Sequence, residues 1–162
     1  MELVFLGTGG SVPTRNRNTS STAVRVGSEV LLFDCGEGTQ RQLMSSTVSF
    51  MKISRIFITH LHGDHFLGLP GLIQSMNFAG RLEPLAIYGP PGTEKLVEEI
   101  LHLGYFQAVF QVSGHDVQDH EVVPGKGYRS RRCAPNTPYH RSDSCWRRTF
   151  GLAVSTRKGR WS

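Results

Sequence analysis

The chain has 162 residues, 38% of them apolar and 19% charged, which is typical of a single soluble globular domain. No apolar run approaches the ~20 residues of a membrane span, no secretory signal opens the chain, and three cysteines without a CxxC pair favour reduced thiols, so we expect a cytoplasmic protein. The formal net charge of +5 comes entirely from residues 127–162, which hold 9 Lys and Arg against a single acidic residue, Asp143. Residues 1–126 hold 9 Lys and Arg against 12 Asp and Glu. The total charge therefore does not by itself predict an RNA-binding surface.

The first part of the chain predicts strands and a hairpin. A strand over 3–6 ends in the glycine-rich segment Gly7-Thr8-Gly9-Gly10, where a tight turn is favoured over a phosphate-binding loop because no helix follows. Residues 11–20 are polar and predict a loop, whose Arg15 and Arg17 are either simply solvated or placed to meet a phosphodiester. Residues 22–26 and 30–33 predict a hairpin, and residues 39–44 a short helix.

Asp34 follows the second strand of this hairpin and requires a partner, because a buried, unpaired carboxylate is costly. The N–H groups of its own turn are one candidate. The free ring nitrogen of a metal-bound histidine is the other.

Strands and helices alternate in the next part. Residues 54–59 predict a strand, and residues 66–78 a helix with Pro70 near its first turn. Residues 85–88 predict a further strand, and residues 94–101 a helix that Thr93 caps. This alternation indicates an α/β sheet.

The stretch between the strand 54–59 and the helix 66–78 carries His60, His62, Asp64 and His65. Residues two apart in extended backbone point the same way, so His60 and His62 present two imidazoles together, while Asp64 and His65 are offered after the turn at Gly63. A lone histidine is usually a surface or core residue, but this many polar groups behind a buried strand are costly to desolvate without a metal. The pattern predicts a metal site, with zinc as the usual partner of imidazole and carboxylate, and its two directions suggest two ions.

These residues match the HxHxDH motif of the metallo-β-lactamase superfamily, and further segments resemble one family within it, the ribonucleases Z. The segments are Phe5-Leu6-Gly7-Thr8-Gly9, Val12-Pro13-Thr14, Arg17-Asn18, Phe33 to Leu43, Ile56 to Leu72 and Ile87 to Gly92. The resemblance reaches from residue 1 to about residue 128. It implies the αββα sandwich of the superfamily, an α/β fold of which this chain carries roughly the first half.

The resemblance also implies a chemistry, that of a zinc-dependent endoribonuclease that removes the 3′ trailer from precursor tRNA and leaves a 3′-hydroxyl. It implies two zinc ions, one bound by His60 and His62 and the other by Asp64 and His65, with Asp64 also the proton acceptor. Precursor tRNA is then the expected partner, and a homodimer the expected assembly.

The chain also departs from the family pattern. The family completes its site with a further histidine, a bridging aspartate and a last histidine in a chain nearly twice as long, and none of these is matched here. We therefore expect this half to be marginally stable and inactive by itself. Two alternatives stay open: a hydrolase of the same superfamily that acts on a small ester or nucleotide, and a non-catalytic metal-binding fragment.

The tail, residues 127–162, has no hydrophobic period apart from residues 150–154 and is rich in Arg, Ser, Pro and Cys, as coding sequence translated in a wrong frame would be. A shifted frame from Asn136 onward permits His-Thr-Val-Pro-Ser-Leu-Gly, which resembles the family's third-histidine motif. We therefore expect residues 1–128 to be the first half of the fold, and residues 129–162 to be a basic irregular tail that is not native to it, in which His140 replaces no ligand. A genuine extension would instead favour non-specific RNA binding.

Overall fold

The computed structural model describes residues 1–133 and 149–154. The chain divides into two compact units, Met1–Asp116 and Val117–Ser162, which are considered separately. Among the described residues, no helix is long and apolar enough to cross a membrane.

The first unit is built on a six-stranded sheet with the order β1-β2-β3-β4-β5-β6. The strands are β1 (Glu2–Gly7), β2 (Ser21–Val26), β3 (Glu29–Phe33), β4 (Ile53–Phe57), β5 (Leu85–Gly89) and β6 (Val112–Asp116). The first three pair antiparallel, and β2 turns into β3 through Gly27, whose φ of 60° suits glycine. From β3 to β6 the pairing is parallel, because helical segments carry the chain from the end of one strand back to the start of the next.

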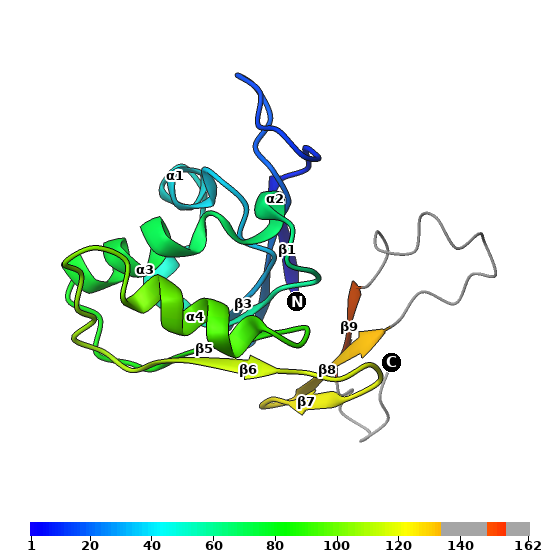
Figure 1. The fold of residues 1–162 in the computed structure, drawn as a ribbon. Coiled ribbons are helices and arrows are strands. Elements are labelled where there is room, and N and C mark those ends of the chain that lie inside the picture. The colour runs from blue at the N-terminus through cyan, green and yellow to red at the C-terminus, as the bar shows by residue number, and fades with distance from the viewer. Residues whose placement is uncertain (134–148, 155–162) are drawn as a thin grey trace, which may run out of the picture. The chain divides into compact units, whose positions relative to one another are not determined.

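The helices cover one face of this sheet (Figure 1). They are α1 (Thr39–Met44), the 3₁₀ turn η1 (Phe50–Lys52), α2 (Gly63–Phe66), α3 (Leu69–Phe78) and α4 (Thr93–Leu101). Leu32, Ile56 and Ile87 lie side by side on neighbouring strands and are fully buried. They pack in one hydrophobic cluster with side chains of α3 and α4 such as Leu72 and Val97. The α/β class predicted from the sequence is confirmed.

The residues that follow these core positions form an aromatic row on the opposite face of the sheet. Phe33, Phe57, Tyr88 and His115 pair in register across β3 to β6. Their ring centroids lie 5.1, 5.3 and 4.9 Å apart in that order, and each pair is stacked. The strict alternation of a strand therefore gives the sheet an aliphatic face toward the helices and an aromatic face away from them.

The elements predicted for the first unit are found in the structure with two corrections, while β6 was not predicted. The helix predicted over 66–78 is two helices, α2 and α3, because Pro70 has no N–H to continue the hydrogen-bond ladder across Leu67 and Gly68. Thr93 does not cap α4. Its hydroxyl donates to the Pro90 carbonyl oxygen instead, and the carboxylate of Asp116 accepts N–H groups at the start of the helix.

The described part of the second unit is an antiparallel sheet of β7 (Val122–Pro124), β8 (Tyr128–Cys133) and β9 (Thr149–Val154), with β8 in the middle. The segment expected to be an irregular tail thus includes most of β8 and all of β9. In β8, Tyr128, Ser130 and Arg132 alternate as buried residues, a period that the polar side chains conceal in the sequence. The segment 134–148, with Asn136 and His140, lies outside the described residues.

Candidate metal centre

The histidine-rich stretch lies where β4 ends, at the carboxyl edge of the parallel part of the sheet. His60 and His62 belong to the connection after β4, and the backbone of His62 is extended (φ −86°, ψ 148°). Asp64 and His65 belong to α2, which begins at Gly63. The local sequence therefore offers two side chains from extended backbone and two from a helix, as the sequence predicted.

The structure brings all four predicted side chains together. Ligand atoms of His60, His62 and Asp64 all lie within 4.8 Å of one another. The ring of His65 lies 3.8 Å from the ring of His60, centroid to centroid, and its Nε2 is 3.4 Å from Oδ2 of Asp64. Asp64 thus lies close to both the His60–His62 pair and His65.

Asp34 has a φ of 59°, and its carboxylate is the buried anchor beneath these histidines. Its Oδ2 accepts a hydrogen bond from Nδ1 of His65 at 2.7 Å and one from the Ser20 hydroxyl at 3.1 Å. Its Oδ1 accepts the N–H and the hydroxyl of Thr59, each at 2.9 Å. Of the two partners that the sequence left open for Asp34, the structure favours the histidine ring nitrogen. Because Nδ1 of His65 makes that bond, its Nε2, on the side of Asp64, is left available as a metal ligand.

Backbone contacts fix α2 against the loop after β3. The N–H of Cys35 donates to the carbonyl oxygen of His65 at 2.7 Å, and the N–H of Gly68 donates to that of Cys35 at 2.9 Å. A Cβ atom at Gly68 would lie 2.2 Å from the carbonyl oxygen of Gly36, and one at Gly36 would lie 2.3 Å from that of Asp64. Only glycine fits at either position, so the two segments are in direct backbone contact.

Asp64 is held from the other side by the loop after β1. Its Oδ2 accepts the backbone N–H of Ser11 at 2.8 Å, and Ser11 has a φ of 57°. Burial raises the pKa of Asp64, but the Ser11 N–H and the neighbouring His65 ring outweigh it, so the net pKa is lowered. Asp64 is therefore an ionised carboxylate at neutral pH.

The histidines differ in their environments. Burial is the main reason that the pKa of His60 is lowered, and the charge on His65 adds to it. Burial also lowers the pKa of His65, but the hydrogen bond and charge of Asp34 reverse this, and the net pKa is raised. The Nε2 atom of His60 is buried and has no hydrogen-bond partner among the described residues.

These features fit a divalent metal ion. The centre holds imidazole rings, an ionised carboxylate, and the buried Nε2 of His60, which has no hydrogen-bond partner in the part of the chain that the structure describes. Such donors are the ones that zinc takes in proteins.

Three contributors to the centre were not singled out from the sequence: the Thr59 hydroxyl, the Ser20 hydroxyl and the Ser11 N–H. The position of Thr59 directly before His60, at the end of the predicted strand, could have indicated its role from the sequence. No local feature of the sequence indicates Ser11 or Ser20, since their contacts to Asp64 and Asp34 span 53 and 14 residues.

Comparison with known proteins places this centre in a family. A family model described as "Anti-Pycsar protein Apyc1" matches residues 1–113. Ribonuclease Z of Methanothermobacter thermautotrophicus is 57% identical over 129 residues, which are 80% of this chain and 42% of that protein. Ribonuclease Z of Methanosarcina mazei is 50% identical over 140 residues, 85% of this chain and 46% of that protein. The chain thus spans less than half the length of these curated relatives.

Solved structures of similar fold include a tRNase Z and another metallo-β-lactamase fold protein. The crystal structure of human tRNase Z, short form, matches with a TM-score of 0.74 and 33% sequence identity, covering 99% of this chain and 66% of the human chain. The metallo-β-lactamase fold protein YhfI of Bacillus subtilis matches with a TM-score of 0.65 at 21% identity, over 94% of this chain and 56% of that one, which supports the fold alone. The chain belongs to the family described as Anti-Pycsar protein Apyc1; its N-terminal part has the metallo-β-lactamase fold and is similar in sequence to proteins named ribonuclease Z.

Proposed function

We propose that the chain carries the metal-binding part of a zinc-dependent endoribonuclease that removes the 3′ trailer from precursor tRNA and leaves a 3′-hydroxyl. The observation that supports this most is the convergence of His60, His62, Asp64 and His65 over the buried carboxylate of Asp34. The high identity to proteins named ribonuclease Z supports precursor tRNA as the substrate class.

We assign His60 and His62 to one zinc ion, and Asp64 and His65 to a second. The unsatisfied Nε2 of His60 and the Asp34-anchored ring of His65 support this assignment. When bound, the zinc ions supply Lewis acidity to the phosphodiester and to the attacking water.

Asp64 is also the proposed proton acceptor. As an ionised carboxylate at neutral pH it can accept a proton from the attacking water. The N–H of Ser11 occupies only Oδ2, so Oδ1 keeps its acceptor capacity.

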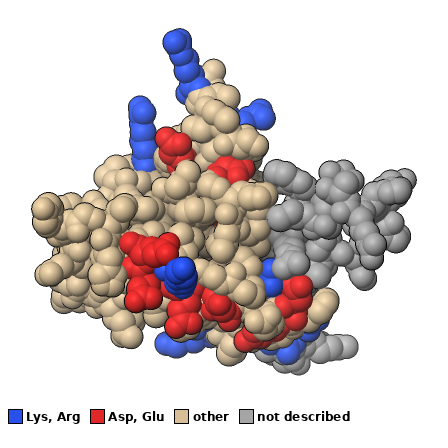
Figure 2. Space-filling view, viewed as in Figure 1, with Lys and Arg blue, Asp and Glu red and all other residues tan. Residues whose placement is uncertain are grey.

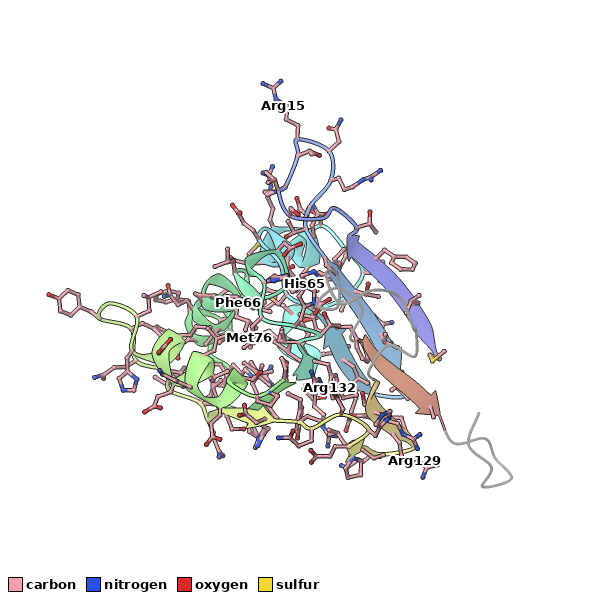
Figure 3. The ribbon with its side chains drawn as sticks, turned by 45° about the vertical axis from the view of Figure 1, so that its right-hand side comes forward. Arg15, His65, Phe66, Met76, Arg129 and Arg132 are labelled. Atoms are coloured by element: carbon pink, nitrogen blue, oxygen red, sulfur yellow. The ribbon has the colours of Figure 1, made fainter. Side chains whose placement is uncertain are left out.

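The loop after β1 is the proposed contact for RNA phosphates away from the scissile bond. Arg15 and Arg17 are exposed. Figure 3 shows Arg15 projecting outward at the tip of this loop, whereas His65 lies in the body of the first unit. Arg17 also lines a cavity of about 290 Å³ with Asn16 and Gln42, and guanidinium groups bind phosphate well.

We further propose a cytoplasmic homodimer. Large exposed apolar side chains gather at the end of α3 and in the loop after α4, namely Phe78, Leu82, Leu103, Tyr105 and Val109. In Figure 2 the left edge of the molecule, where these segments lie, is tan and shows no Lys, Arg, Asp or Glu on the visible face. Apolar patches of this kind are typical of protein interfaces.

The domain boundary remains a proposal as well. Residues 1–128 would form the first half of the sandwich, and residues 129–162 would be foreign to it. In the proposed enzyme, the second half of the sandwich, which residues 129–162 do not provide, would supply the remaining ligands of the two zinc ions.

A chimera tests the proposed function. Residues 1–126 are joined to the remainder of the Methanothermobacter thermautotrophicus relative, and cleavage of a 3′-extended precursor tRNA is measured with zinc. We expect a product that ends in a 3′-hydroxyl, and a loss of at least ~100-fold in His62→Ala. His102→Ala is the matched control, since that exposed imidazole bonds only the carbonyl oxygen of Glu98 among the interactions described.

Three outcomes separate the alternatives. A folded, zinc-loaded chimera that spares tRNA but hydrolyses a small phosphodiester supports the hydrolase of a small ester or nucleotide. A folded chimera that binds zinc weakly or not at all and cleaves neither substrate supports the non-catalytic fragment. Equal activity in His62→Ala and His102→Ala contradicts the proposed ligand set.

A further inference from the structure

The hydroxyl of Thr59 lies at the centre of the polar network beneath the metal centre. Its Oγ1 is 2.9 Å from Oδ1 and 3.2 Å from Oδ2 of Asp34. It is also 3.0 Å from Nδ1 of His60 and 3.3 Å from Nδ1 of His65. The backbone N–H of Thr59 donates to the same carboxylate at 2.9 Å, so the residue is fixed at two points.

The chemistry of these groups sets the direction of each hydrogen bond. A carboxylate only accepts, so the single proton of the Thr59 hydroxyl goes to Asp34. The Thr59 oxygen then has only lone pairs left for His60, and the contact at 3.0 Å requires Nδ1 of His60 to carry the ring proton. A neutral imidazole has one ring proton, so Nε2 of His60 carries a lone pair.

The position of His60 Nε2 agrees with this reasoning. The atom is buried and has no hydrogen-bond partner among the described residues. A proton on that nitrogen would be a buried donor without an acceptor, which is unfavourable. A lone pair there is instead a ready metal donor.

We propose that Thr59 is a positioning residue that transmits the charge of Asp34 to His60 and thereby fixes the His60 tautomer with its Nε2 lone pair toward the metal. One carboxylate then orients two imidazoles, His65 by direct contact and His60 through the threonine hydroxyl. The metal role rests on the proposed function, whereas the tautomer is a property of the chain itself.

The test compares Thr59→Val, which has nearly the same shape without the hydroxyl, with Thr59→Ser, which keeps it. Thr93→Val is the matched control, because it removes another threonine hydroxyl that bonds a carbonyl oxygen far from the histidines in sequence. The ¹⁵N signals of the His60 ring are read by NMR at pH 8 in the chelator-treated chain, and zinc affinity is measured by competition with a chromophoric chelator. Circular dichroism verifies that each variant folds.

We expect protonated Nδ1 and unprotonated Nε2 in the wild type, Thr59→Ser and Thr93→Val, and a mixture of tautomers in Thr59→Val. Zinc affinity should fall about 10–100-fold in Thr59→Val and stay near wild type in the other two. A proton on Nε2 in the wild type overturns the proposal, as does a Thr59→Val chain that keeps the wild-type tautomer.

The two readouts separate this proposal from the proposed function. A wild-type chain that binds no zinc contradicts the metal site, while the NMR result still decides the role of Thr59. Should Thr59→Val fail to fold, the wild-type tautomer and its retention in Thr59→Ser carry the decision.

Discussion

The substitution Gly68→Ala should have two opposite effects on the free energy of unfolding, and their magnitudes can be compared. The backbone of Gly68 is helical (φ −77°, ψ −16°), so alanine meets no conformational strain there and should stabilise by about 0.4–1 kcal/mol through the unfolded state. The added Cβ, however, would lie 2.2 Å from the carbonyl oxygen of Gly36 and 2.9 Å from that of Cys35. Both obstacles are backbone atoms, so one segment must move by roughly 1 Å.

The steric effect should win. Overpacking of this kind costs about 1–3 kcal/mol, and the hydrogen bonds between Cys35, His65 and Gly68 are worth about 0.5–1.5 kcal/mol each. We expect Gly68→Ala to lose about 2–4 kcal/mol of unfolding free energy, a fall of roughly 5–15 °C in Tm. Zinc affinity should fall as well, because the displaced His65 loses its contact with Asp34.

Urea unfolding followed by circular dichroism measures this, with Gly10→Ala as the control. A Cβ at Gly10 meets no atom within 4 Å, so that variant should stay within about 0.5 kcal/mol of the wild type. If Gly68→Ala is as stable as Gly10→Ala, the reasoning about the backbone contact is wrong.

Three further substitutions test other features. Ser11→Gly should gain roughly 0.5 kcal/mol in thermal unfolding, because it relieves a φ of 57° and keeps the N–H that Asp64 accepts. The N–H groups of Glu94 and Gly92 lower the pKa of Asp116, so its stabilisation of α4 is present above the usual aspartate pKa and is lost as pH falls through the lowered value. Asp116→Asn should therefore cost at most about 1 kcal/mol of unfolding free energy at pH 7 and less at pH 3, as measured by urea unfolding at both pH values. Arg81 is buried and donates to three backbone carbonyl oxygens, which the single ammonium of Arg81→Lys cannot all reach, so about 2–4 kcal/mol should be lost in urea unfolding with zinc affinity unchanged.

Local signals made much of the first unit predictable. The bounds predicted for α1 agree with the structure and those for α4 agree to within one residue, because helical spacing and short-range turn signals define them. The motif from His60 to His65 was found because all four side chains lie within six residues of one another. Where sequence distance is short, composition and periodicity carry the information.

Long-range contacts explain what the sequence did not predict. The cap of α4 comes from Asp116, 22 residues beyond Glu94, so the local candidate Thr93 was chosen in error. The strand β6 was missed because Val-Ser-Gly-His-Asp has little β-propensity, and pairing with β5 decides its conformation. The anchoring of His65 by Asp34 was only one of two possibilities until the fold brought together residues 31 apart.

The aromatic row from Phe33 to His115 has a consequence for folding kinetics. Each ring stacks on a residue more than twenty positions further along the chain, so no stack can form before the intervening loop has closed. Contacts of such high sequence separation form slowly, and the row should therefore complete late, after the hairpin of β2 and β3. Tyr88 has neighbours on both sides, and its ring signals would report the moment at which β4, β5 and β6 come into register.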